Sequence, residues 1–348
     1  MTPPHPAKSI LLIELWGIGD ATLLTSALRG LLADGAQVTV LAKATTCALL
    51  KANYPLITTI EFDAPWTAFY HKYQFTRWPW MKIFRLLGHL RRQRYDAATS
   101  VRPDPRDHLL MWLAGVRRRV GFPTRWSRWC LNQPVPKTPL AHKVEDWWKL
   151  QDQLTSVLQA HLPPQLTADP TIGREFQTRF AADPRPVLAL HCGARIPVRR
   201  WPESYYRQVI LALRRKFDFQ LVLIPDPDGY GSTLRDVAEH TFDQLSLPEM
   251  LALFSCATTV LCNDSGPCHI AAALDIPVIA FFGPQLPELF RPFGPKHHVV
   301  IRDLCAYRPC SDYCRYPEPY CLTKLTPELA YPEIEVHLAS LGKLPLKG

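Results

Sequence analysis

Short apolar runs alternate with amphipathic segments in the first half of the chain. An apolar run at residues 9–15 precedes a glycine-containing turn, a segment with helical apolar spacing at 21–32, and a second apolar run at 37–41. Short runs of this kind predict strands, and apolar positions that recur every three to four residues predict a helix. The order strand, helix, strand predicts a parallel sheet.

The second half repeats this alternation. It follows a helical pattern at 143–159 and a stretch rich in proline and polar residues at 161–186. We expect strands at 187–191, 220–224, 259–262 and 277–282. We expect helices at 203–216, 232–240, 248–257 and 267–274.

These patterns predict an α/β protein with two doubly wound, Rossmann-like domains. We expect a first domain at 1–160, a connector at 161–186, a second domain at 187–325, and a closing helix at 326–348 that returns to the first domain. Open parallel sheets bind ligands at the carboxyl ends of their strands, so a cleft between the two sets of strand ends is the expected site.

Composition narrows the class of protein. The chain has 348 residues, 47% of them hydrophobic, which suits two ordinary cores. We find neither a run of about 20 apolar residues nor a signal peptide, so we expect a cytoplasmic protein, and its ten cysteines are then expected to be reduced. The net charge of +9 favours a polyanionic partner, but no nucleic-acid-binding module is present and the basic residues are scattered.

The first strand-to-helix turn reads Trp16-Gly17-Ile18-Gly19-Asp20-Ala21-Thr22. Threonine at position 22 takes the place of the third glycine of a dinucleotide fingerprint, which argues against a nicotinamide enzyme. Asp20 stands where a helix N-cap belongs, so it is either a cap or a general base at a strand end.

Two later turns also join a strand to a helix. The first runs from His191 through Arg199 and Arg200, whose guanidinium groups suit a diphosphate, although a solvated basic loop has the same composition. The second reads Asn263-Asp264-Ser265-Gly266-Pro267-Cys268-His269, and its backbone amides at a helix start suit an anion. Taken alone, Asp264 could have a purely structural role, and His269 could be a packed core residue.

With these turns in this order, the chain resembles the ADP-heptose:lipopolysaccharide heptosyltransferases, a GT-B glycosyltransferase family. The resemblance covers residues 9–330 and is carried by four segments: ILLIELWGIGDATLLTSALRGL, LHCGARIPVRRWPE, LCNDSGPCHIAAALDIPVIAFFGP and DLCAYRPCSDYCRYPEPYCLTKLTPE. It implies an inverting enzyme without metal or cofactor that transfers a heptose from ADP-heptose to a phosphorylated, lipid-linked acceptor of the lipopolysaccharide core.

The resemblance also implies roles for individual residues. Asp20 is the catalytic base, and Arg199 stands where the family usually has a lysine on the donor phosphates. The amides of Ser265 and Gly266 hold the phosphates, and Asp264 and His269 line the donor sugar. The strand that ends before Asp226 and Asp228 lacks the usual glycine pair, and Cys192 replaces a common proline. Asp226 and Asp228 are therefore only candidate contacts for the nucleoside.

Two further features are open to more than one interpretation. Cys305, Cys310, Cys314 and Cys321 lack the Cys-x2-Cys spacing of zinc knuckles, so buried free thiols are preferred to a zinc or iron–sulfur site. Between residues 65 and 94 aromatic and basic residues interleave, Trp78, Trp80, Arg91 and Arg92 among them. This stretch is either ordinary helix and loop or a lip that holds the enzyme peripherally on the inner membrane and receives the acceptor.

Other functions remain open from the sequence. A binding protein without catalysis would keep the nucleotide site and use Asp20 only as a helix cap. Another GT-B enzyme with a different nucleotide sugar, including a UDP-sugar 2-epimerase, would share the same turns.

Overall fold

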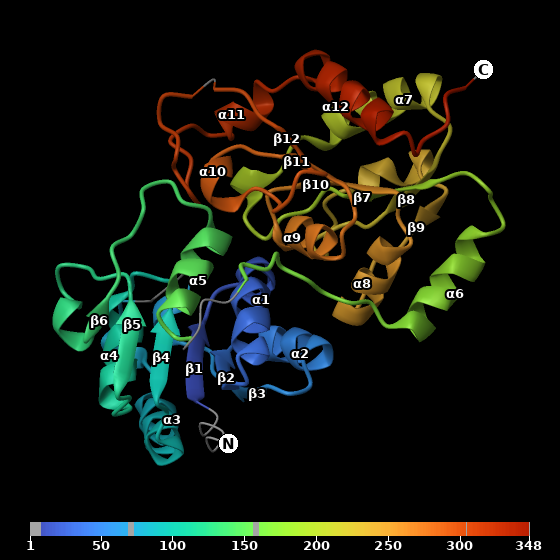
Figure 1. The fold of residues 1–348 in the computed structure, drawn as a ribbon. Coiled ribbons are helices and arrows are strands. Elements are labelled where there is room, and N and C mark those ends of the chain that lie inside the picture. Colours follow the sequence, from blue (N-terminus) through green and yellow to red (C-terminus); the bar gives the residue numbers. More distant parts are fainter. Residues whose placement is uncertain (1–7, 69–72, 156–159, 304, 348) are drawn as a thin grey trace. The chain divides into compact units, whose positions relative to one another are not determined.

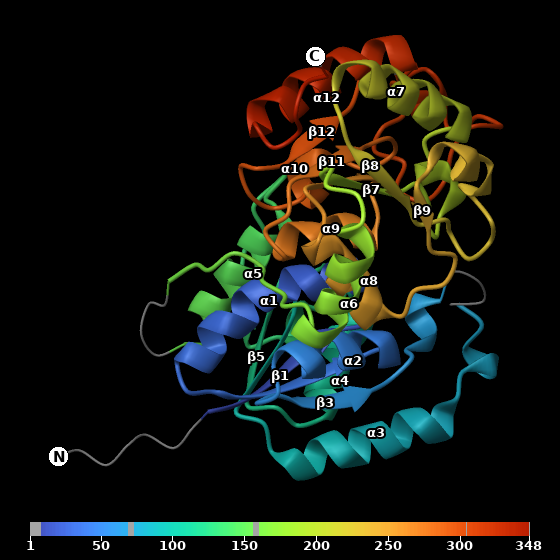
Figure 2. The same ribbon diagram turned by 90° about the vertical axis from the view of Figure 1, so that its right-hand side faces the viewer.

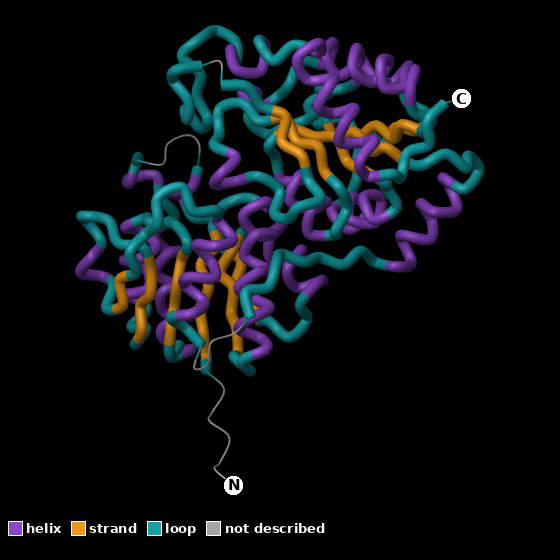
Figure 3. Tube along the Cα trace, turned by 45° about the horizontal axis from the view of Figure 1, so that its top comes forward, coloured by secondary structure: helices purple, strands orange, loops and turns teal. Residues whose placement is uncertain are grey.

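The computed structural model describes residues 8–68, 73–155, 160–303 and 305–347. The chain divides into two compact units, residues 1–164 and 165–348. Figure 3 shows a separate sheet in each unit. Each sheet has six strands, and every strand pair within it is parallel.

The first unit has the strand order β3-β2-β1-β4-β5-β6. Its strands are β1 Ser9–Glu14, β2 Gln37–Ala42, β3 Thr58–Glu61, β4 Ala97–Ser100, β5 Arg118–Gly121 and β6 Gln133–Pro134. Its α-helices are α1 Ile18–Ala33, α2 Ala44–Asn53, α3 Trp80–Gln93, α4 Pro105–Leu113 and α5 Lys143–Asp152. Its 3-10 helices are η1 Pro65–Thr67, η2 Phe75–Arg77 and η3 Arg128–Cys130.

Alternating side chains of the central strand β1 build two cores on opposite faces of this sheet. Ile10 and Leu12 pack with residues of α1, α2 and α5. Leu11 and Ile13 pack with residues of α3 and α4. The sheet is therefore covered by helices on both faces, which explains why residues 10–13 of its central strand are all apolar (Figure 1).

The second unit has the strand order β12-β11-β10-β7-β8-β9. Its strands are β7 Val187–His191, β8 Gln220–Leu223, β9 His240–Thr241, β10 Thr259–Asn263, β11 Val278–Phe281 and β12 His298–Val300. Its α-helices are α6 Pro170–Phe180, α7 Glu203–Lys216, α8 Leu247–Ser255, α9 Gly266–Ala273, α10 Pro287–Phe290, α11 Tyr320–Thr323 and α12 Pro327–Leu341. Its 3-10 helices are η4 Pro197–Arg199 and η5 Ser232–Val237.

Helices α7 and α12 share a core with the strands on one face of this sheet, while α8 and α9 lie on the other face (Figure 1). Three segments differ from the sequence expectation. The stretch 161–186 contains α6, which packs on α8, and α12 packs on α7 and β12 of its own unit. The expected helix at 232–240 is wrong beyond η5, because His240 and Thr241 form the edge strand β9 beside β8.

Each sheet has one point at which the strand order reverses. In the first unit β1 lies between β2 and β4, and in the second unit β7 lies between β8 and β10. At this point the chain connections from two neighbouring strands run to opposite sides of the sheet. The loops that follow these two strands therefore separate, which leaves room for a ligand at the carboxyl ends of the strands. The predicted site residues follow these strands.

Candidate functional site

In the first unit, Asp20 lies at the start of α1, just after β1. Gly17, not Asp20, is the N-cap residue of α1, and Asp20 is in the first helical turn. The cap interpretation of Asp20 is therefore wrong. A carboxylate at this position is favoured by the positive end of the helix dipole.

Charged residues from three elements gather at the reversal point near Asp20. Glu14 is the last residue of β1 and is 0% exposed, and its Oε1 accepts a hydrogen bond from the Trp16 amide at 3.0 Å. Arg102 follows β4 and Lys143 begins α5, and these cations lie 4.8 and 5.4 Å from the Trp16 ring centroid. Neither Glu14 nor the two cations are predicted from the sequence, although an acid at the end of an otherwise apolar strand can indicate a functional residue.

The surroundings shift the pKa of two of these groups. Burial and the charge of Asp20 raise the pKa of Glu14 to about 8, against the lowering effect of the Trp16 amide, Arg102 and Lys143. Burial and the nearby Lys137 lower the pKa of Lys143. Arg102 is held by two carboxylates, at 2.8 Å from Asp104 and 3.5 Å from Asp107.

In the second unit, the structure brings together two residues that the sequence placed in the donor site. Arg199 lies in η4 after β7, Asp264 follows β10, and their Nη1 and Oδ2 atoms are 3.3 Å apart. The other Arg199 nitrogen, Nη2, lies 2.7 Å from Asp312 in the loop before α11. Asp312 was missed from the sequence, because the loop that carries it has no regular structure that predicts its position.

Asn263 fixes the relative position of the two strand ends. Its Oδ1 accepts hydrogen bonds from the Trp201 amide at 3.0 Å and from the Tyr206 hydroxyl at 2.9 Å. Its Nδ2 donates to the Cys192 carbonyl at 2.6 Å. This fully buried amide therefore ties the end of β10 to the turn that carries Arg199.

The turn at 263–269 also has the predicted form. Ser265 is the N-cap residue of α9 and Gly266 is its first residue, and the Ser265 side chain makes no capping hydrogen bond. Instead, the Ser265 hydroxyl donates to the Asn263 carbonyl at 3.3 Å. The helix start thus presents its backbone amides at the strand ends, where an anion can accept from them. His269 lies in the same helix and is 6% exposed.

The two candidate nucleoside contacts bind an arginine in this structure. Arg200 Nη2 lies 2.8 Å from Asp226 and 2.6 Å from Asp228. Its Nε donates to the Ala194 carbonyl at 2.7 Å. A Cβ at Gly193 would lie 2.5 Å from the Asp226 carboxylate, so glycine is needed there for Asp226 to approach the turn.

The predicted lip is partly buried. Trp78 packs against the core of the first unit, with its ring 5.6 Å from Trp66, whereas Trp80 is 42% exposed. Arg91 Nε donates to the Leu113 carbonyl at 2.6 Å, and Arg92 is exposed. Residues 69–72 of the same stretch, with Phe69, Tyr70 and Lys72, lie outside the described residues.

All four tail cysteines are free thiols, and burial with the nearby Cys310, Cys305 and Cys314 raises the pKa of Cys321 to about 11. Across the described ranges, no three His, Cys, Asp or Glu side chains are arranged to hold a metal ion. Nor does any described helix have the length and apolar content needed to cross a bilayer.

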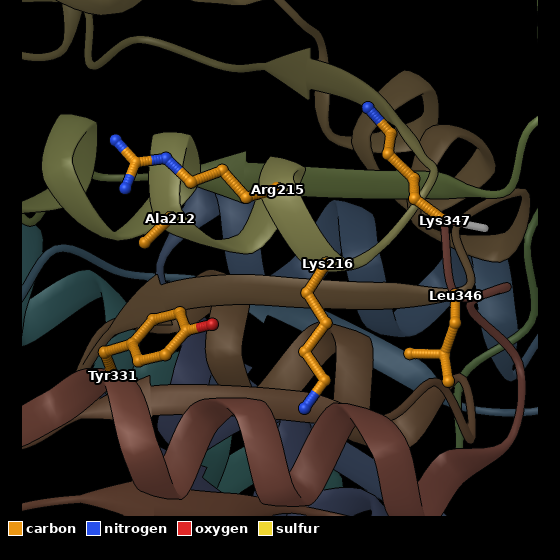
Figure 4. Close-up of a pocket in the computed structure, with 6 residues that line it drawn as sticks. All are labelled: Ala212, Arg215, Lys216, Tyr331, Leu346 and Lys347. Atoms are coloured by element: carbon orange, nitrogen blue, oxygen red, sulfur yellow. The ribbon is translucent and has the colours of Figure 1, made fainter.

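One open cavity lies away from the strand ends. It measures about 430 Å³ and is lined by Ala212, Arg215, Lys216, Tyr331, Leu346 and Lys347 (Figure 4). Because α7 runs back from the carboxyl end of β7, its last turn lies at the opposite edge of the sheet from Arg199. This cavity, which exposed Arg215 and lysines line, therefore lies apart from the candidate site.

Comparison with known proteins identifies the family. Residues 83–318 match glycosyltransferase family 9 (heptosyltransferase), which is more than half of the chain. The chain belongs to this family. The resemblance seen in the sequence is therefore confirmed, and the protein is a glycosyltransferase of the heptosyltransferase family.

Individual members of family 9 are similar over most of the chain. Lipopolysaccharide heptosyltransferase 2 of Salmonella typhimurium is 26% identical over 237 residues, which are 62% of this chain and 68% of that protein. The solved E. coli ADP-heptose lps heptosyltransferase II has a TM-score of 0.72 at 22% identity, covering 96% of this chain and 99% of that one. A family 9 structure from Veillonella parvula has a TM-score of 0.76 at 17% identity, with 97% and 99% covered. These likenesses confirm the predicted GT-B fold.

Proposed function

We propose that this family 9 enzyme transfers a heptose from ADP-heptose to an acceptor of the lipopolysaccharide core, with inversion at the anomeric carbon. The observation that carries the proposal is the location of both predicted groups of residues at the reversal points of their sheets. Asp20 lies beside β1 in the first unit, and Arg199 and Asp264 meet after β7 and β10 in the second. The named relatives act in lipopolysaccharide synthesis, which supports this choice of acceptor.

The proposed chemistry divides between the two units. Asp20 removes the proton of an acceptor hydroxyl while that oxygen bonds to the anomeric carbon and the bond to the nucleoside diphosphate breaks. The departing diphosphate gains negative charge, which Arg199 and the amides of Ser265 and Gly266 are placed to stabilise. Asp264 and His269 are proposed to contact the donor sugar. These groups supply the positive charge that the leaving group needs, so the proposal involves no metal ion.

The ion pairs that Arg199 makes with two carboxylates are compatible with its proposed role in binding the diphosphate. Arg199 is 20% exposed at its side chain and bridges Asp264 and Asp312. A diphosphate carries more charge than a carboxylate and accepts bidentate hydrogen bonds from guanidinium, so it can displace one of these partners. Asp226 and Asp228 are weaker candidates for the nucleoside, because both already accept from Arg200.

We also propose that the enzyme works in the cytoplasm, peripherally on the inner membrane, through α3. The helix buries Ile83, Leu86 and Leu90 and leaves Met81 and Phe84 exposed, at 66% and 61%. Arg85 and Arg92 lie on the same outward side as those two, and Figure 2 shows α3 along the outside of the first unit. Apolar and basic side chains on one exposed face suit an anionic lipid surface, where a lipid-linked acceptor resides.

The experiment that tests the donor and reaction is a product analysis. Purified enzyme with ADP-heptose and a heptose-deficient lipopolysaccharide core should release ADP and increase the acceptor mass by one heptose residue. UDP-sugars should give no product, and the anomeric configuration of the product, read by NMR, should be opposite to that of the donor. A change in the donor sugar without any acceptor would instead indicate an epimerase, and binding without turnover would indicate a non-catalytic protein.

A further inference from the structure

A buried carboxyl group stands at the reversal point of the first sheet, six positions before Asp20. Glu14 ends β1 and has 0% exposure. One of its oxygens accepts from the Trp16 amide at 3.0 Å. The other, Oε2, is buried and has no hydrogen-bond partner among the residues that the structure describes. A buried, half-satisfied carboxylate is costly, whereas a protonated carboxyl in the same place is much less so.

Three charged groups from other elements act on Glu14. They are Asp20 on α1, Arg102 after β4 and Lys143 at the start of α5. Arg102 is shared with Asp104 and Asp107, so its charge is already largely compensated. Lys143 is 6% exposed and is the first residue of its helix, where the helix dipole disfavours a cation. The cations therefore offset only part of the repulsion between two neighbouring carboxylates.

We infer that Glu14 is a positioning residue for the base: it is protonated at neutral pH, and its ionisation at alkaline pH strengthens Asp20 as a proton acceptor. The inference rests on the proposed role of Asp20. While Glu14 is neutral, the positive charge of Lys143 acts on Asp20 without an opposing negative charge from Glu14. When Glu14 loses its proton to solvent, the new negative charge makes Asp20 bind the acceptor proton more tightly.

The rate of the reaction should therefore depend on the ionisation of Glu14 as well as on that of Asp20. Proton transfer to a stronger base is faster, so kcat should rise as Glu14 ionises. Because Glu14 only modulates the base, the rise should be well below the roughly hundredfold contribution of a complete general base. Donor binding takes place on the second unit and should not follow this ionisation.

The test compares kcat between about pH 6 and about pH 9.5 for three proteins, with saturating ADP-heptose and acceptor. Glu14→Gln keeps the shape and its carbonyl still accepts from the Trp16 amide, but the side chain cannot ionise. Asp63→Asn is the matched control, because Asp63 is 87% exposed at its side chain. We expect the alkaline rise in wild type and Asp63→Asn and its absence in Glu14→Gln, with an unchanged KM for the donor.

An alkaline rise that persists in Glu14→Gln would overturn the inference, as would an equal loss of kcat at every pH. If Glu14→Gln does not fold, Lys143→Met gives a second test: without this cation the alkaline inflection should move to higher pH, and an unmoved inflection would count against the inference. Asp20→Asn separates the two claims. Normal turnover in Asp20→Asn defeats the proposed base, whereas an inactive Asp20→Asn with an unaltered profile in Glu14→Gln defeats only the role of Glu14.

Discussion

Arg199 links the turn after β7 to the turn after β10 through its ion pair with Asp264. If it holds the donor phosphates, Arg199→Ala removes a charge-assisted contact and should weaken ADP and ADP-heptose alike by about 1.5–3 kcal/mol. Titration calorimetry measures this directly. Arg215→Ala, an exposed change in the same unit, should leave both affinities unaltered. Unaltered ADP affinity in Arg199→Ala would place the diphosphate elsewhere.

Asp312 should act in the opposite direction. It lies 2.7 Å from Arg199 and competes with a phosphate for the same guanidinium. Because the pair is partly exposed, at 20% and 33% of the side chains, its strength is modest. Asp312→Asn should therefore tighten ADP binding by about threefold. Weaker binding in this variant would mean that Asp312 holds Arg199 in place for the phosphate.

The buried Glu14 should also affect how the stability of the protein depends on pH. Its pKa in the folded protein is raised, so the folded state holds the proton more tightly than the unfolded state does. Wild type should then lose stability as the pH rises from the ordinary carboxyl range through the raised pKa. Glu14→Gln removes this dependence and should melt several degrees above wild type at about pH 9, with the gap closing towards about pH 5. A constant gap across that range would show that Glu14 is already ionised in the folded protein.

The local chemistry was only partly readable from the sequence. The strand-to-helix turns placed Asp20, Arg199 and Asp264 at strand ends, because glycine and proline mark such turns strongly. Asp312 and Lys143 were not predictable, since both reach their partners from segments far away in sequence. Contacts of that kind depend on the fold and leave no local pattern.

At the scale of single helices, we predict that the exposed face of α3 binds anionic membranes. Met81→Ser with Phe84→Ser, combined with Arg85→Ser and Arg92→Ser, changes only exposed positions. Each surface cation near an anionic membrane contributes about 1 kcal/mol, so this variant should bind anionic vesicles far more weakly while melting like wild type. Wild-type binding should itself fall as salt rises. Vesicle co-sedimentation measures both.

Trp78→Ala is the matched comparison for α3. Trp78 packs on the core between Trp66 and Trp80, so its loss should lower the melting temperature without first removing vesicle binding. Activity on a short, soluble acceptor should survive the α3 substitutions. Vesicle binding equal to that of wild type in the fourfold variant would show that this face meets something other than a membrane.

Secondary structure was predictable to different degrees in the two halves. The predicted β1, α1 and β2, and most elements of the second unit, lie within a few residues of the observed ones because their apolar periodicity is regular. Helix α3 was not predicted, because its three buried residues follow an exposed tryptophan and are interrupted by exposed phenylalanine and arginine. The short strands β5, β6 and β9 lack an apolar run, and pairing with a neighbouring strand defines them.

For the whole molecule, the donor should stabilise the protein selectively. A ligand that binds only the folded state at 100 times its dissociation constant adds about 2.7 kcal/mol. ADP and ADP-heptose should therefore raise the melting temperature, and UDP-sugars at equal concentration should not. A larger shift with a UDP-sugar would favour the alternative GT-B activities.

The central claim is that Asp20 is the base in heptose transfer from ADP-heptose. The most direct measurement is single-turnover transfer to the core acceptor by wild type and Asp20→Asn, with donor affinity determined for both. The account predicts that transfer falls by about a hundredfold or more while donor affinity is unchanged, because the base acts on the acceptor proton. Transfer by Asp20→Asn within a few-fold of wild type would contradict it.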